Sequence, residues 1–72
     1  MNLYLLTYDR KLGRLLSIDK FAPGEYEHAN RAMLAKERAH PDLEVVLLEA
    51  ASEDQLRLTH RRYFEDVTLL AS

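Results

Sequence analysis

Two hydrophobic runs that do not alternate with polar residues constrain the fold of this chain more than any other feature. Residues 3–6 read Leu-Tyr-Leu-Leu and residues 45–48 read Val-Val-Leu-Leu. A strand that is apolar on both faces needs cover above and below it. A chain of 72 residues has few elements with which to cover both faces of a sheet. We therefore expect self-association or a protein partner to supply part of the cover.

The composition limits the class of protein. With 47% hydrophobic and 31% charged residues, we expect one compact domain spanning residues 1–72 rather than a disordered chain. The sequence has no cysteine, which favours a reducing, cytoplasmic setting. Residues 1–10 lack the pattern of a signal peptide, and no apolar run approaches the roughly 18 residues of a membrane span. The net charge of −2 provides no global attraction for nucleic acid.

The first two strands are predicted to form a hairpin. Residues 3–8 and 14–21 are apolar runs with β character, and a loop of about four residues joins them. The Asp9 side chain can open a turn, and Gly13 can adopt the positive φ that closes it.

A first helix is predicted from Gly24 to Ala39, because its first turns are acidic, its last turn is basic and His40 precedes a proline. Glu27 and Arg31 are spaced for an ion pair within the helix. Three residues recur at helical spacing and predict the buried stripe: Tyr26, Ala29 and Met33.

A third strand is predicted over Leu43–Ala50, followed by a second helix from Glu53 to about Phe64. Ser52 and Gln55 have the spacing of a capping box. The face of this helix that is expected to meet the sheet carries Leu56, Thr59, His60 and Tyr63. The apolar tail, Val67–Leu70, is compatible with a short fourth strand or with a cap over the core.

The predicted fold class is α+β, with the order ββαβα and a short final strand as an option. The sheet is expected to be a small, single-layer, mixed sheet in the order 2-1-3. A crossover through the first helix then makes the third strand parallel to the second. Both helices are expected to pack on one face.

We therefore hypothesise a non-enzymatic protein-interaction module that self-associates as a homodimer. The uncovered sheet face would bury against a second copy or a protein partner. An edge strand that pairs across a two-fold axis is an alternative. The candidate interface residues are Tyr4, Leu6, Tyr8 and Leu15.

The alternative hypothesis is a small nucleic-acid-binding or regulatory protein. Its contacts would come from the hairpin loop and the second helix. We disfavour it because residues 53, 57, 61 and 65 form a Glu-Arg-Arg-Glu series at i, i+4 spacing, and Arg62 has the same spacing to Asp66. The candidate contacts are Arg10, Lys11, Arg14, Arg57, Arg61 and Arg62.

No catalytic, metal or cofactor site is predicted. His60 next to Arg61 resembles a general base beside an anion-binding group, but the helical pattern directs His60 toward the sheet, where a structural role is commoner. Residues 25–28 and 37–40 are both Glu-x-x-His segments, a spacing found in di-iron bundles. Both copies fall on one helix and point in different directions, so a metal site is not expected.

Overall fold

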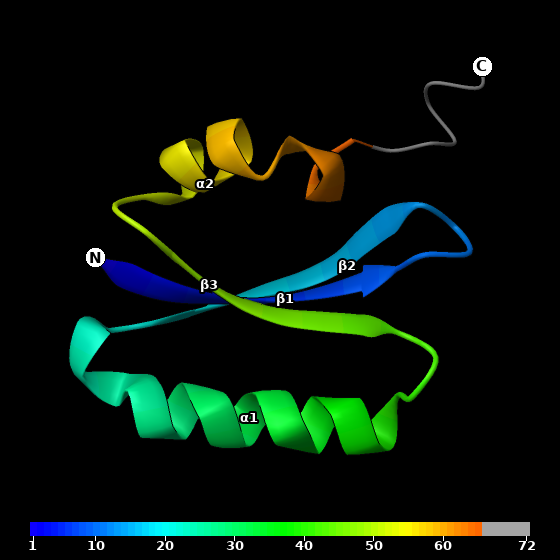
Figure 1. Ribbon diagram of the computed structural model, residues 1–72, viewed down its shortest axis with the longest axis horizontal. Helices are drawn as coiled ribbons and strands as arrows, with labels where there is room; N and C mark the ends of the chain where they lie inside the picture. The colour runs from blue at the N-terminus through cyan, green and yellow to red at the C-terminus, as the bar shows by residue number, and fades with distance from the viewer. Residues whose placement is uncertain (66–72) are drawn as a thin grey trace.

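The computed structural model describes residues 1–65, which form a three-stranded sheet with helical elements above and below it (Figure 1). The expected strand or cap at Val67–Leu70 lies outside the described residues. The elements in chain order are β1 (Asn2–Asp9), β2 (Arg14–Phe21), the 3-10 turn η1 (Pro23–Glu25), α1 (Tyr26–Ala39), β3 (Glu44–Ala50), α2 (Glu53–Thr59) and the 3-10 turn η2 (Arg61–Tyr63).

The hairpin between β1 and β2 forms as its turn residues predict. The Asp9 carboxylate accepts hydrogen bonds from the backbone N–H groups of Lys11 and Leu12, at 2.9 and 3.1 Å. The Gly13 N–H donates to the Asp9 carbonyl at 2.8 Å, and Gly13 has a φ of 66°. This left-handed conformation strains residues that carry a Cβ, so glycine is the residue that suits the position.

The sheet has the predicted order, with β1 in the centre between β2 and β3. The α+β class and the order ββαβα are confirmed. β1 pairs antiparallel with both neighbours, so β2 and β3 run in the same direction without touching, and the sheet is antiparallel rather than mixed. Leu6 lies at the middle of this arrangement, opposite Ile18 on β2 and Val46 on β3.

The two helices lie on opposite faces of the sheet, which corrects the expectation that both share one face (Figure 1). The alternation of a strand explains the result, because successive side chains of β1 point to opposite faces. Both sets are apolar, and each needs cover. Lys36 of α1 reaches Thr7 on one face, whereas Leu56 of α2 packs in a cluster with Tyr4 and Leu6 on the other.

The larger part of the core lies beneath α2 and η2. Tyr4, Leu6 and Leu56 are almost completely buried there, and Tyr8 and Tyr63 meet edge to face with ring centroids 5.4 Å apart. Complete burial of an apolar side chain of this size contributes about 1.5–3 kcal/mol. This short helical segment therefore closes the face that was expected to remain open.

α1 covers its face with small residues. Ala29 is fully buried and Met33 is partly buried, as the helical spacing predicts. Tyr26 departs from the predicted stripe, because its side chain is 57% exposed. It opens the helix directly after η1, and a small inner stripe lets α1 lie close to the sheet without it.

α2 ends at Thr59, five residues before the predicted end of the second helix. His60 leaves the helical region with φ −124° and ψ 53°, and η2 follows it. The Thr59 hydroxyl donates to the Gln55 carbonyl and lies 2.9 Å from Nδ1 of His60. Side-chain bonds of this kind compete with helix continuation. The break lets Tyr63 turn down onto Tyr8 and the start of β3.

Candidate functional site

The predicted interface residues do not lie on an open surface. Tyr4, Leu6 and Tyr8 are each 6% exposed or less within a single chain, and Leu15 packs partly buried against the same cluster. The premise of an uncovered sheet face is therefore wrong, because α2 and η2 supply the cover. Any association with another chain therefore needs a different surface. The two edge strands of the sheet, β2 and β3, are candidates because their outer sides present backbone N–H and C=O groups.

The outer edge of β3 is apolar and regular. In residues 1–65, β3 has a neighbouring strand on one side only, and its ladder with β1 runs from Asn2 opposite Ala50 to Tyr8 opposite Glu44 without a register shift. The four residues at its centre are half-buried: Val45, Val46, Leu47 and Leu48. The strand contains no glycine or proline, and its acidic residues lie toward its ends.

The outer edge of β2 is irregular and charged. Its ladder with β1 shifts register between Thr7 and Tyr8, which leaves Leu16 as an extra residue in β2. Leu16 is 49% exposed. The strand also carries Arg14, Asp19 and Lys20. Bulges and charges of this kind are the features by which sheet edges avoid pairing with other chains.

Lys36 connects α1 to β2 through a polar cluster that sequence reasoning missed. Its Nζ donates to the Thr7 and Ser17 hydroxyls at 3.3 and 3.1 Å and to the Asp19 carboxylate at 2.9 Å. A lysine beside a serine resembles a Ser–Lys pair. Here the ammonium is already bonded to a carboxylate, so it acts as a cation with three acceptors. The cluster closes the polar part of the α1 face.

A second polar cluster joins η2 to the start of β3. The Tyr63 hydroxyl donates to the Glu44 carboxylate at 2.6 Å, and Arg62 donates to the same carboxylate and to the Tyr63 oxygen. The Arg62 guanidinium also lies 4.3 Å from the centre of the Tyr63 ring. Arg62 therefore bonds across the fold to Glu44, a contact that the spacing to Asp66 did not predict. Asp66 lies outside the described residues.

This cluster shifts the acidity of all three groups. The hydrogen bond from Tyr63, followed by the bond from Arg62, holds the pKa of Glu44 below its ordinary value. Burial and the neighbouring Glu44 carboxylate raise the pKa of the Tyr63 phenol. The Glu44 carboxylate also raises the pKa of Arg62. The contacts form an ion pair with an attached phenol, and they join η2 to β3.

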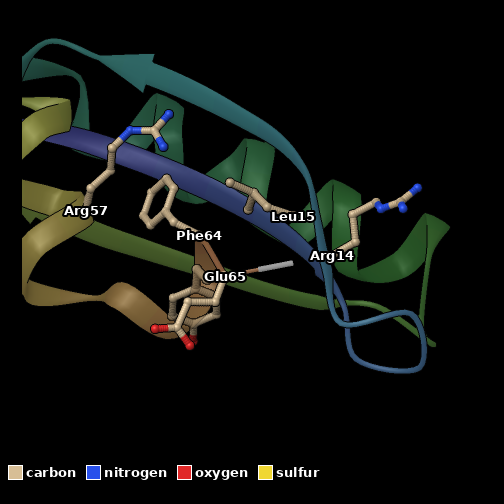
Figure 2. A pocket seen from close by; sticks show the side chains of 6 residues that line it. Arg14, Leu15, Arg57, Phe64 and Glu65 are labelled. Atoms are coloured by element: carbon tan, nitrogen blue, oxygen red, sulfur yellow. The ribbon is translucent and has the colours of Figure 1, made fainter. Parts of the chain in front are cut away.

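Two of the predicted anion contacts, Arg14 and Arg57, meet at a cavity of about 180 Å³ (Figure 2). Leu15, Tyr63, Phe64 and Glu65 complete the lining. Arg57 lies over the Phe64 ring, 4.6 Å from its centre, and donates to the Glu53 carboxylate at 3.0 Å. Figure 2 shows the Arg14 guanidinium directed away from Phe64. The cavity is thus flanked by two arginines, and Arg57 is already paired with Glu53.

The remaining predicted cations do not join this cavity. Lys11 lines a separate cavity of about 320 Å³ together with Asp9 and Asp42. Arg10 is exposed and lies near enough to Glu44 to help lower the pKa of that carboxyl. Arg61 is exposed on η2, beyond the end of α2. Among residues 1–65, the predicted ladder therefore keeps only its first pair, Glu53 with Arg57.

The histidines do not gather metal ligands or catalytic partners. His28 lies on the surface with its Nδ1 3.6 Å from the Glu25 carboxylate and its ring against Phe21. His60 is half-buried and contacts the Thr59 hydroxyl. His40 is exposed directly after α1. Within residues 1–65, no group of three or more histidine or acidic residues could hold a metal ion.

These features define the described part of the chain as an α+β domain, in which an antiparallel sheet of three strands carries one helix on each face. Comparisons with protein-family models, with curated proteins and with solved structures find no match to this chain. None of the helices in residues 1–65 has the length and apolar character needed to cross a bilayer.

Proposed function

We propose that this protein is a non-enzymatic protein-interaction module, and that it binds its partner by adding a strand to the outer edge of β3. One observation supports the proposal above the others. Val45–Leu48 form a regular, half-exposed, apolar edge, whereas the β2 edge of the same sheet carries a bulge and charges.

Strand addition depends on the unpaired backbone groups at the edge of a sheet. Alternate residues of an edge strand present N–H and C=O groups that no strand pairs. An added strand satisfies these groups with main-chain hydrogen bonds, and its side chains contact the apolar residues on both faces of the edge. A long, flat and apolar edge is usually protected in monomeric proteins. Its persistence beside a protected β2 edge supports a role in binding.

The test is a labelled peptide that repeats residues 43–51 with lysines added for solubility, titrated with the protein and followed by fluorescence anisotropy. We expect saturable binding. Val45→Lys should weaken it about tenfold, because an inward charge at an edge costs on the order of 1.4 kcal/mol in binding. Leu16→Lys is the matched control at the other edge and should leave the affinity unchanged.

Two results would contradict this function. The first is a peptide that does not bind at any concentration at which it stays soluble. The second is a Leu16→Lys variant that weakens binding as much as Val45→Lys does. Circular dichroism and a urea midpoint for each variant separate these results from unfolding.

An anion-binding role, for nucleic acid, is the second candidate and rests on the cavity that Arg14 and Arg57 flank. It ranks lower because Arg57 is paired with Glu53 and Arg62 with Glu44. Retention on single-stranded RNA or DNA at low salt, lost steeply as salt rises, would raise it to first place. Absence of retention at low salt would exclude it.

A further inference from the structure

The flank of α1 that points away from β2 carries exposed apolar residues. Lys36 points into the sheet, because its Nζ bonds Thr7 on β1 as well as Ser17 and Asp19 on β2. The flank of α1 toward β2 is marked by His28, whose ring contacts Phe21. A helix turns about 100° per residue, so Tyr26 and Asn30 lie nearly opposite His28, and Leu34 lies between their flank and the solvent face. Leu34 is 43% exposed and shares this flank with residues one turn apart along the helix. We call these four residues the outer flank: Tyr26, Asn30, Leu34 and Arg38.

The outer flank lies on the same side of the molecule as the β3 edge. α1 lies mainly against β3 and β1, and it reaches β2 through Lys36 and His28. Strands in a sheet are about 4.8 Å apart. If two β3 strands paired across a two-fold axis, with each α1 above the line between β3 and β1, the two α1 axes would lie about 10 Å apart. This spacing falls at the upper end of the 8–10 Å at which helices pack.

The charges of α1 are complementary in that arrangement. Glu27 and Arg38 lie at equal distances from the midpoint of α1, so an antiparallel pair of α1 helices places Glu27 opposite Arg38 of the partner subunit. Neither residue forms an ion pair within residues 1–65, and the predicted pair of Glu27 with Arg31 is absent there. Two symmetric ion pairs would therefore form without breaking an existing one.

The pairing of β3 with itself also avoids repulsion. An antiparallel pair centred on Leu47 places Glu44 opposite Ala50 of the partner subunit and Glu49 opposite Val45 of the partner subunit. No acidic residue then faces another across the pair, which would be destabilising.

We infer that the partner of the β3 edge is a second copy of this chain, which pairs antiparallel through β3 and packs the outer flank of α1 against its equivalent. The inference rests on the proposed function, because it uses the same edge. It specifies the partner and the direction of the added strand. It also adds a contact between the two α1 helices, which a bound peptide would not make.

The first experiment is sedimentation of the purified chain across micromolar concentrations. We expect a dimer, and Arg38→Glu should weaken dimerisation at least tenfold because it places Glu27 opposite a second glutamate twice. Glu27→Arg combined with Arg38→Glu should restore the affinity. Lys20→Glu changes the net charge by the same amount at the β2 edge and should leave the dimer unaffected.

The second experiment is crosslinking, which the lack of native cysteine makes specific. Leu34→Cys lies close to the expected two-fold axis, so a short bismaleimide should join two copies in high yield. Leu58→Cys, on the exposed side of α2, is the control and should give little covalent dimer.

The outcomes separate this inference from the function beneath it. A chain that stays monomeric up to about 100 μM, yet binds the β3 peptide, overturns the inference and leaves the proposed function standing. A dimer that ignores Arg38→Glu and does not crosslink through Leu34→Cys also overturns it, because its interface lies elsewhere. Failure of the peptide to bind to a chain that is monomeric at the concentration used contradicts the proposed function itself.

Discussion

The two edges of the sheet differ in regularity and in charge, two features that govern pairing with another chain. β2 carries a bulge at Leu16, charged residues along its length and a lysine bridge from α1. β3 continues without a register shift and presents four apolar residues in a row. β2 and β3 both pair with the central strand β1, so the difference between the edges does not come from the strand that they pair with. Within residues 1–65, the β2 edge therefore carries features that oppose pairing with another strand, and the β3 edge lacks them.

The largest expected effect comes from a substitution in the central strand β1, with which both edge strands pair. Leu6→Ala should lower the free energy of unfolding by about 2–5 kcal/mol, because Leu6 is fully buried between Ile18 and Val46 and its loss leaves a cavity. The measurement is a urea midpoint with hydrogen exchange, in which β2 and β3 should lose protection together. Leu58→Ala, at a side chain that is 74% exposed, should change stability by less than about 0.5 kcal/mol. Loss of protection confined to one edge would contradict the dependence of both edge strands on β1.

An intermediate effect should separate the edges. Tyr63→Phe removes the hydroxyl that donates to Glu44, at the first residue of β3. A hydrogen bond to a charged group contributes about 1.5–3 kcal/mol, and Arg62 retains part of the interaction, so we expect a loss of about 1–2 kcal/mol. Hydrogen exchange should rise near Glu44 and stay unchanged in β2. Equal changes in both strands would show that the effect of this bond is not specific to β3.

The smallest expected effect is a pH dependence of the stability that Glu44 contributes through its contacts with Tyr63 and Arg62. The folded state lowers the pKa of Glu44 below its ordinary value of 4.5, first through Tyr63 and then through Arg62. A lowered carboxyl pKa contributes stability that is present above about pH 4.5 and is lost as the pH falls through the folded pKa. Glu44→Gln lacks this contribution, so the stability difference between the two proteins should shrink from pH 7 to pH 3. Urea midpoints measure it, and a difference that stays constant with pH would contradict the assignment.

The local parts of the fold could be predicted from sequence. Asp9 and Gly13 specify the hairpin through their own hydrogen bonds and φ, and Ser52 caps α2 by accepting from the Gln55 N–H. Gln55 reaches back to the Ala51 N–H, one residue before the cap. The strand order followed from the apolar character of β1, which needs neighbours on both sides.

The features that could not be predicted from the sequence depend on contacts between residues far apart in the chain. Glu44 and Tyr63 are 19 residues apart, and nothing in either neighbourhood indicates their bond. The helical pattern continues past Thr59 in the sequence, but α2 ends there, where the Thr59 hydroxyl bonds the Gln55 carbonyl and lies beside His60. The cover over Tyr4 and Leu6 was missed for the same reason, because it comes from Leu56 and Tyr63, which lie far along the chain from β1.

The bulge at Leu16 also limits how far an assembly of such chains can grow. A subunit with two open edges has two points of attachment, so copies add at both ends and build a filament without a natural length. A subunit with one open edge has a single point of attachment, and a pair uses up both. If copies pair through β3 as inferred, the extra residue in β2 leaves each subunit a single point of attachment, and assembly stops at a pair.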